Sequence, residues 1–238
     1  MDKKIEIPEV IFYAGPMSSG KTGRIHSLIG KFIATHTPYE VFKPFHDIRD
    51  SVIKPRGMSN GDAYEATVIK SFEEIDAERL FRIGKLTLLI DEIFMLGYDE
   101  NRQPIPDAYY NAIQRLGRAG ITRVFASGLN IAASGHVFPV FSDAERFGAD
   151  IVYMTADCGY PENGDNDPTC CAPARNSQIW SKKFHMPIRP TSLPDLLPEG
   201  YNPDLEYIPV CPKHNILAYS EDASIEYIEL TELNARVA

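Results

Sequence analysis

The sequence predicts an α/β fold, in which a parallel β-sheet carries helices on its faces, followed by a smaller region of different character. Over residues 1–150, short apolar runs alternate with helical patterns, which is typical of a parallel sheet. From Gly159 to Asp204, Gly, Pro, Asn and Asp become frequent and helical periodicity is lost, and all 4 cysteines follow residue 157. We therefore predict a core domain over 1–150 and a loop-rich second domain over 151–238 that ends in an acidic tail.

The elements of the core follow from hydrophobic patterning. Apolar residues spaced at i, i+3, i+4, i+7 and i+8 from Ile25 to Ile33 predict a helix that packs on a sheet. A second helix is indicated by Tyr109, Ile113 and Leu116, with Gly120 as its stop. Short apolar runs predict strands at 10–13, 41–42, 86–90, 124–126 and 151–154.

Composition narrows the possible partners. The 238 residues carry 33 acidic and 24 basic side chains, a net charge of −9, which argues against binding to a nucleic-acid backbone. No apolar run reaches the roughly 18 residues of a membrane span, and the first residues lack the apolar core of a secretory signal. We expect a cytoplasmic protein without nucleic-acid or membrane partners, whose clustered cysteines favour a metal site.

A phosphate-binding loop is the strongest motif. The stretch Gly15-Pro16-Met17-Ser18-Ser19-Gly20-Lys21-Thr22 fits G-x4-G-K-[ST], follows a predicted strand and opens a predicted helix. Its backbone N–H groups and the helix N-terminus favour an anion, Lys21 can reach the β- and γ-phosphates, and the Thr22 hydroxyl can bind Mg²⁺. The motif therefore predicts binding of a nucleoside triphosphate such as ATP with Mg²⁺.

Two acidic residues directly after the predicted strand 86–90 support the prediction of a triphosphate site with Mg²⁺. Asp91 stands where a fold of this kind places its second acidic group, and it can hold Mg²⁺ directly or through water. Glu92 comes next and is a candidate general base.

Further blocks, in order, resemble the thymidine kinase family that carries a zinc-bearing lasso domain. The resemblance covers residues 10–215 and rests on five segments besides the phosphate loop, each matching a family motif: Val41 to Arg49 (K-P-x-x-D-x-R), Ile53 to Gly57, Leu89 to Glu92 (I-D-E), Gly128 to Phe138, and Glu206 to His214.

The resemblance implies a RecA-like P-loop NTPase core with a zinc-binding lasso domain that acts as a substrate lid. It also implies transfer of phosphate from ATP to the 5′-hydroxyl of thymidine, a homotetramer, and feedback inhibition by dTTP. By motif, Glu92 is the general base, Lys21 and Arg49 stabilise the transferred phosphoryl group, and Asp47 belongs to the magnesium shell.

The predicted base pocket departs from the family pattern. Met17, Leu129 and Tyr207 match family positions, whereas Ala133 and Met95 stand where the family has aromatic residues and Phe94 replaces a Gln. Loss of an aromatic–base contact costs about 1–3 kcal/mol by analogy with stacking platforms. A pocket for a bulkier pyrimidine and a weakened thymidine activity both fit this change. Another P-loop phosphotransferase or ATPase, or a nucleotide-binding protein without turnover, are the alternatives.

The candidate metal ligands are Cys158, Cys211, His214 and one of the neighbours Cys170 and Cys171. Cys211-x-x-His214 has the spacing of a zinc knuckle, and Zn²⁺ accepts thiolates and imidazole in a tetrahedral set. Eleven residues, 159–169, separate Cys158 from Cys170, which we interpret as an insertion into the family's C-x2-C pair. The offsets of Ala174 and Ser177 match family positions when counted from Cys170, so Cys170 is the preferred fourth ligand.

Overall fold

The computed structural model describes residues 7–47, 51–55, 57–59, 62–99, 101, 103–161, 170–190, 204–216 and 227–229. They belong to two compact units. Unit 1 comprises Met1–Ala14, Gly20–Gly128 and Pro139–Tyr153, and unit 2 comprises Gly15–Ser19, Leu129–Phe138 and Met154–Ala238. Two short segments of the predicted core region, 15–19 and 129–138, thus group with the second unit.

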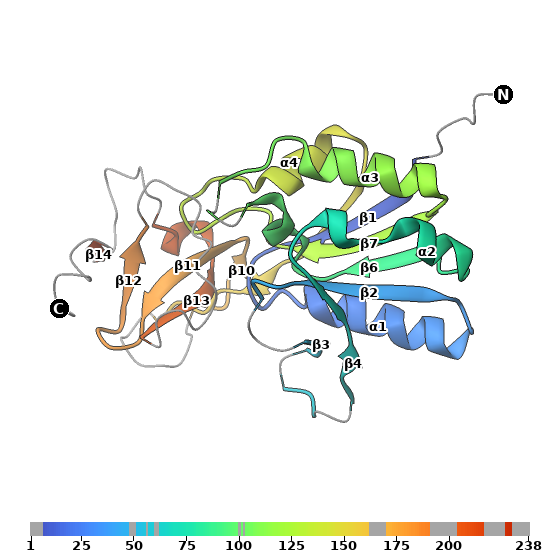
Figure 1. Cartoon of the computed structure of the whole chain (residues 1–238). Coiled ribbons are helices and arrows are strands. Elements are labelled where there is room, and N and C mark those ends of the chain that lie inside the picture. Colours follow the sequence, from blue (N-terminus) through green and yellow to red (C-terminus); the bar gives the residue numbers. More distant parts are fainter. Residues whose placement is uncertain are drawn as a thin grey trace. The chain divides into compact units, whose positions relative to one another are not determined.

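A six-stranded parallel sheet with the order β5-β2-β6-β7-β1-β8 forms the centre of unit 1 (Figure 1). Its strands are β1 (Glu9–Ala14), β2 (Tyr39–Pro44), β5 (Thr67–Ile69), β6 (Thr87–Ile90), β7 (Arg123–Gly128) and β8 (Asp150–Tyr153). The remaining elements of unit 1 are α1 (Lys21–Ala34), β3 (Val52–Ile53), β4 (Tyr64–Glu65), η2 (Phe72–Glu74), α2 (Ala77–Arg82), η3 (Ile93–Gly97), α3 (Ala108–Ala119) and α4 (Pro139–Arg146). The predicted parallel α/β core is confirmed.

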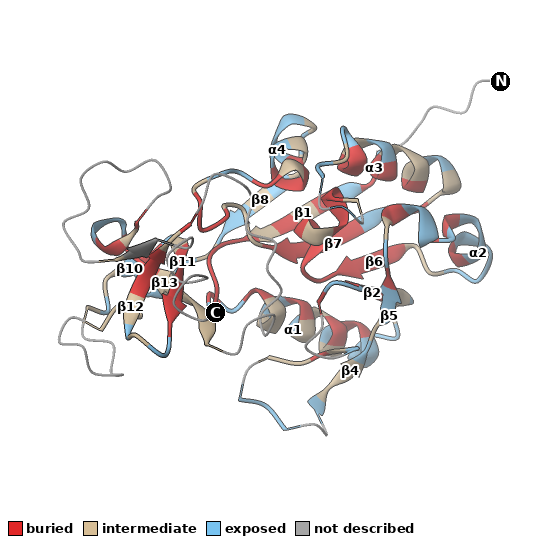
Figure 2. Cartoon of the chain, turned by 60° about the vertical axis from the view of Figure 1, so that its left-hand side comes forward, coloured by how far each residue is buried: buried red, intermediate tan, exposed pale blue. Residues whose placement is uncertain are grey.

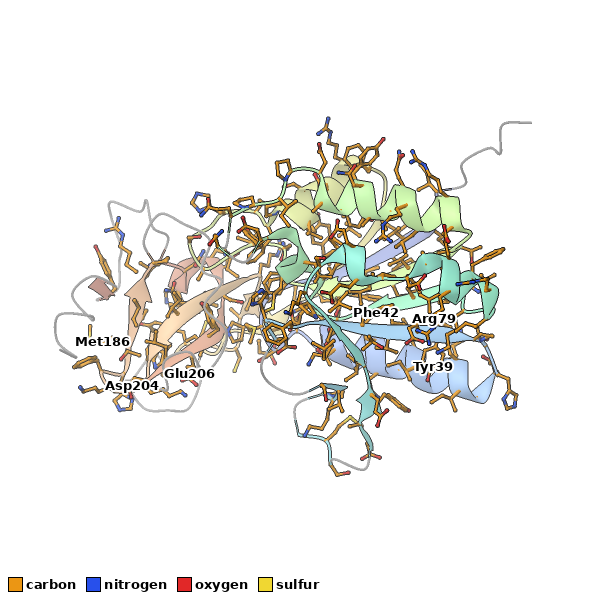
Figure 3. The ribbon with its side chains drawn as sticks, in the orientation of Figure 1. Tyr39, Phe42, Arg79, Met186, Asp204 and Glu206 are labelled. Carbon is orange, nitrogen blue, oxygen red and sulfur yellow. The ribbon has the colours of Figure 1, made fainter. Side chains whose placement is uncertain are left out.

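One face of this sheet packs against α1. Ile25, Ile29 and Phe32 of the helix join a buried cluster with alternate residues of three strands, Val41, Leu89 and Phe125. The antiparallel pair β3–β4 covers part of the same face through Ile53 and Tyr64. Side chains alternate along a strand, so Tyr39 lies on the α1 face of β2 and Phe42 on the opposite face (Figure 3).

The opposite face packs against α4 and α3. The rings of Phe12 on β1 and Phe141 on α4 meet edge to face, with centroids 5.7 Å apart. Gly97 of η3 lies against Val140, whose Cγ2 would be 2.6 Å from a Cβ at that position, so a larger residue would require Val140 to move. The central strands are buried almost throughout, whereas the helices expose their outer faces (Figure 2).

Both predicted helices are present and their ends follow local backbone chemistry. Helix α1 begins at Lys21, directly after Gly20, which has the left-handed φ of 84°. Helix α3 ends before Gly120, whose left-handed φ of 96° turns the chain so that the N–H of Ile121 donates to the carbonyl oxygen of Leu116 at 3.0 Å.

Unit 2 contains a four-stranded sheet with the order β13-β11-β12-β14 and a short antiparallel pair β9–β10. Its elements are β9 (Ala156–Asp157), β10 (Pro173–Ala174), β11 (Asn176–Ser181), β12 (Met186–Arg189), β13 (Leu205–Val210), η4 (Pro212–His214) and β14 (Ile228–Glu229). The prediction of a loop-rich stretch over 159–204 was wrong for 176–181 and 186–189, which form β11 and β12. These strands are short and β12 contains Pro187, so their sequences lack the alternation that would have revealed them.

The side chain of Gln178 is buried in unit 2, and its amide nitrogen and oxygen both make hydrogen bonds. Its Nε2 donates to the carbonyl oxygen of Ile188 at 2.6 Å, and its Oε1 accepts from the N–H of Ile216 at 2.8 Å. A buried amide is tolerated when its donors and acceptors are paired, so Gln178 ties β11 to β12 and to the chain after η4.

No helix within the described residues combines the length and the apolar character needed to cross a bilayer.

Replacing Gly120 by Ala is expected to destabilise unit 1 by more than the backbone strain of a left-handed residue, about 1–3 kcal/mol. A Cβ at Gly120 would lie 2.5 Å from Cδ2 of Phe81, so the ring must also move. The matched control is Gly84→Ala, because Gly84 has a φ of 77° but open space around its Cβ position. Chemical unfolding of the two variants measures the difference. Equal loss of stability would show that the Phe81 contact contributes nothing.

Candidate functional site

The phosphate loop connects β1 to α1 in the conformation that an anion-binding loop requires. Ser18 and Gly20 have left-handed φ values of 60° and 84°, which turn the backbone and its N–H groups. Gly15 allows close backbone packing, because a Cβ there would lie 2.4 Å from the carbonyl oxygen of Met154. Lys21, at the first position of the helix, is 6% exposed. The sequence-predicted loop thus has both its glycines explained by geometry.

The second half of the predicted triphosphate site is a hydrogen-bonded group around Asp91. Thr22 Oγ1 donates to Asp91 Oδ2 at 3.1 Å, and Ser127 Oγ donates to Asp91 Oδ1. Asp91 is 2% exposed and Ser127 is fully buried. The pairing of a loop threonine with a strand-end aspartate provides the two oxygen ligands that a P-loop protein offers to Mg²⁺, so the residues present fit that ion. Ser127 was not predicted from the sequence.

The register of the sheet explains why these groups meet. β2 pairs with β6 through Phe42 and Ile90, and β6 pairs with β7 through Ile90 and Ala126. The next residue on each strand is Lys43, Asp91 and Ser127 respectively. These three therefore form one row across the carboxyl edge of the sheet, on the face covered by α1, which carries Thr22.

Glu92 follows Asp91 and has an unusual backbone. Its φ and ψ of 52° and 37° are left-handed, although it is neither glycine nor asparagine, and it is 5% exposed. Such a conformation costs about 1–3 kcal/mol and is found preferentially at functional sites. The bend begins η3, which places Phe94 in the core against Gly128 and leaves Met95 half-buried.

The motif after β2 brings two residues together that sequence analysis had not paired. Lys43 Nζ lies 2.8 Å from Asp47 Oδ2, and the two side chains are 5% and 2% exposed. Arg49, the third predicted member of this region, lies outside the described residues. The signal that could have revealed Lys43 is its place in K-P-x-x-D-x-R, four residues before the aspartate.

The predicted base-pocket residues of unit 2 occupy different environments. The N–H of Met17 donates to Ser177 Oγ at 2.9 Å, so Met17 is tied to β11. Ala133 belongs to a buried hydrophobic cluster with Ile179 and Ile188, and Tyr207 packs at its margin. Leu129 is half-buried.

Four ligand atoms of unit 2 form a compact group. Sγ of Cys158, Cys170 and Cys211 and a ring nitrogen of His214 all lie within 4.8 Å of one another. His214 Nδ1 is 3.5 Å from Cys158 Sγ and 3.6 Å from Cys211 Sγ, and the sulfurs of Cys170 and Cys211 are 3.9 Å apart. A tetrahedral zinc ion with its usual bond lengths keeps its ligand atoms about 3.5–3.8 Å apart, so the set fits Zn²⁺. Cys171 is exposed and is not part of this group.

The backbone around the sulfur atoms shapes their acidity. Burial raises the pKa of the Cys158 thiol to about 11, and the N–H of Cys211, which donates to its Sγ at 3.3 Å, lowers it in part. Burial also raises the pKa of Cys211, but the backbone N–H groups of His214 and Lys213 together with the hydrogen bonds to Cys158 and Cys170 leave that pKa lowered. Amide groups that point at sulfur are those that stabilise a thiolate ligand.

Aromatic rings pack around the imidazole of His214. Tyr160 stacks on His214 with ring centroids 4.2 Å apart and an angle of 17°, and it meets Trp180 edge to face at 5.7 Å. Tyr160 comes from the start of the predicted insertion, so that segment contributes a ring packed on one member of the group.

Two comparisons with known proteins do not identify a family. No protein-family model matches the chain. A solved structure, the genome packaging NTPase B204 from Sulfolobus turreted icosahedral virus 2 in complex with ATP-gammaS, is similar at 15% identity over 59% of this chain and 86% of that one. Its TM-score is 0.32, too low to bear on the assignment.

A curated protein gives the decisive likeness. A thymidine kinase from Thermococcus kodakarensis is 33% identical over 164 residues, which are 69% of this chain and 75% of the relative. That length takes in most of the relative, and the phosphate loop with its strand-end acids is in place, so the chain belongs to the thymidine kinase family.

Proposed function

We propose that this protein transfers the γ-phosphoryl group of ATP to the 5′-hydroxyl of a deoxypyrimidine nucleoside, with thymidine as the first substrate to test. The observation that carries the proposal is the buried group of Thr22, Asp91 and Ser127 with Glu92 next to it in a left-handed conformation. Membership of the thymidine kinase family supports the choice of acceptor.

The phosphate end of the reaction depends on the loop and its lysine. Backbone N–H groups of residues 15–20 and the Lys21 ammonium hold the triphosphate, whose charge is opposite to theirs. Thr22 and Asp91 would hold Mg²⁺, which when bound neutralises charge on the triphosphate. Because the loop supplies fixed donors, it positions ATP without the cost of reorganising water.

The acceptor end depends on Glu92. Its carboxylate takes the proton of the 5′-hydroxyl as the oxygen attacks phosphorus. Burial keeps water away from this carboxylate, and the left-handed backbone of Glu92 ends the direction of β6 at this residue. Arg49 and Asp47 are proposed to act beside it, on the phosphoryl charge and in the magnesium shell respectively.

The base of the nucleoside is proposed to contact Met17, Met95, Leu129, Ala133 and Tyr207. The methyl group of Ala133 offers no ring for stacking, so the site is expected to tolerate a wider range of pyrimidines than an aromatic pocket would. Zn²⁺ held by Cys158, Cys170, Cys211 and His214 is proposed to have a structural role in unit 2. Feedback inhibition by dTTP and a homotetramer stay predictions.

Glu92→Gln is expected to lower kcat for nucleoside phosphorylation by about 10²–10⁴-fold, the usual contribution of a general base. Binding of Mg-ATP should persist, because the phosphate loop is unchanged. Purified protein is assayed with Mg-ATP and a panel of deoxynucleosides while ADP and the monophosphate are followed. The control is Glu73→Gln, which changes an exposed acid of the same unit.

Two outcomes would count against the kinase proposal. If the wild-type protein binds ATP but phosphorylates no nucleoside of the panel, the protein is a nucleotide-binding protein of another kind. If Glu92→Gln turns over as fast as Glu73→Gln, Glu92 is not the base.

Cys170→Ser is expected to lose bound zinc and Cys171→Ser to retain it, because only Cys170 lies with the other three ligand atoms. Elemental analysis of freshly purified protein measures the zinc content, and competition with a chromophoric chelator compares affinities. The two substitutions are chemically identical and adjacent, so each controls for the other. Equal zinc content in both variants would remove Cys170 from the ligand set.

A further inference from the structure

Lys43 is a buried cation that the proposed reaction has not yet used. The residue is 4% exposed, and lysine is almost never buried to this extent unless it is paired. Its ammonium lies 2.8 Å from Asp47 Oδ2 and donates to the carbonyl oxygen of Val52 at 3.4 Å. A buried charge with such partners holds them in place, because moving them away would leave it uncompensated.

The position of Lys43 in the sheet is specific. It stands level with Asp91 on the neighbouring strand, in the row that also contains Ser127, on the face covered by α1. Its ammonium therefore belongs to the carboxyl edge of the sheet, where the phosphate loop and the strand-end acids lie. In α/β proteins this edge is the one that binds ligands.

Asp47 and Val52, which both contact Lys43, lie at different points of the chain. Asp47 comes shortly after the end of β2, and Val52 begins β3. One side chain thus contacts the chain both where it leaves β2 and where it enters β3. The backbone assists at the first end, since the N–H of Asp47 donates to the carbonyl oxygen of Pro44 at 3.0 Å.

We propose that Lys43 is a positioning residue for phosphoryl transfer: its buried ammonium holds the carboxylate of Asp47 in place at the carboxyl edge of the sheet. This inference rests on the proposed kinase function and assigns a role within it. Lys43 acts through Asp47 and is not itself required to touch the substrates. The ion pair is therefore expected to affect kcat more than the KM for ATP.

The same strands provide a matched control. Lys85, just before β6, pairs with Glu40 on β2 at the opposite end of the sheet, and these side chains are 36% and 20% exposed. Lys85→Met therefore removes a lysine–carboxylate pair that joins the same region of the fold, away from the carboxyl edge. Nothing in the proposed reaction depends on it.

The test compares Lys43→Met, Lys43→Arg and Lys85→Met in steady-state nucleoside phosphorylation. We expect Lys43→Met to lower kcat by about 10²-fold, the effect of a misplaced catalytic group, with an unchanged KM for ATP. Lys43→Arg should restore most of kcat, because it returns the positive charge. Lys85→Met should match the wild-type protein.

Lys43→Met leaves the carboxylate of Asp47 buried without this cation, so the variant is also expected to be less stable. The double variant Lys43→Met/Asp47→Asn removes both charges and is expected to regain thermal stability while kcat stays low. A pair that only stabilises the fold would instead give back turnover together with stability.

The outcomes separate this role from the kinase proposal. A wild-type protein that phosphorylates no nucleoside overturns the kinase proposal, and this role with it. If the wild-type protein is active and Lys43→Met turns over as fast as Lys85→Met, the positioning role alone is overturned. Where Lys43→Met does not fold, the same comparison is made with the double variant.

Discussion

The hydrogen bonds that Asp91 accepts from Thr22 and Ser127 are the contacts on which the rest of unit 1 depends. They join the first turn of α1 to the ends of β6 and β7, so the helix that follows the phosphate loop is held against the sheet. The carboxylate is 2% exposed, and a buried charge of this kind is stable only while its hydrogen-bond partners stay in place. The packing of Ile25, Ile29 and Phe32 on the sheet supplies the apolar support for that geometry.

The carboxyl edge of the sheet carries buried positive side chains, although the net charge of the chain is negative. The chain has a net charge of −9, yet Lys21 and Lys43 are among its buried side chains. The cost of burying them is offset by partners of opposite charge or by the ligand that the site is built to hold. The left-handed backbone of Glu92 adds strain at the same place, which the surrounding core of Ile90, Ile93 and Phe94 maintains. The burial of these lysines and the backbone strain at Glu92 reduce local stability, but they hold the side chains in fixed positions.

Unit 2 has a different source of order. Its sheet is small, and its interior includes the fully bonded amide of Gln178 as well as Ile179 and Ile188. Cys158, Cys170 and Cys211 lie close in sequence to the ends of β9, β10 and β13, and His214 lies on the short helix η4 that follows β13. Strand pairing thereby gathers residues that are distant in the sequence into the group that would hold a metal ion.

The sequence by itself determined the parallel core, the phosphate loop and the strand-end acids, because these depend on short-range patterns: apolar runs, glycine spacing and the residue that ends a strand. Spacing also indicated Cys211 with His214, and the preferred Cys170 lies within the same group of candidate ligand atoms. Only the tertiary structure decided the partners of Lys43 and Ser127, the bend at Glu92 and the sheet of unit 2. These depend on the register between strands and on long-range packing, and neither leaves a periodic trace in the chain.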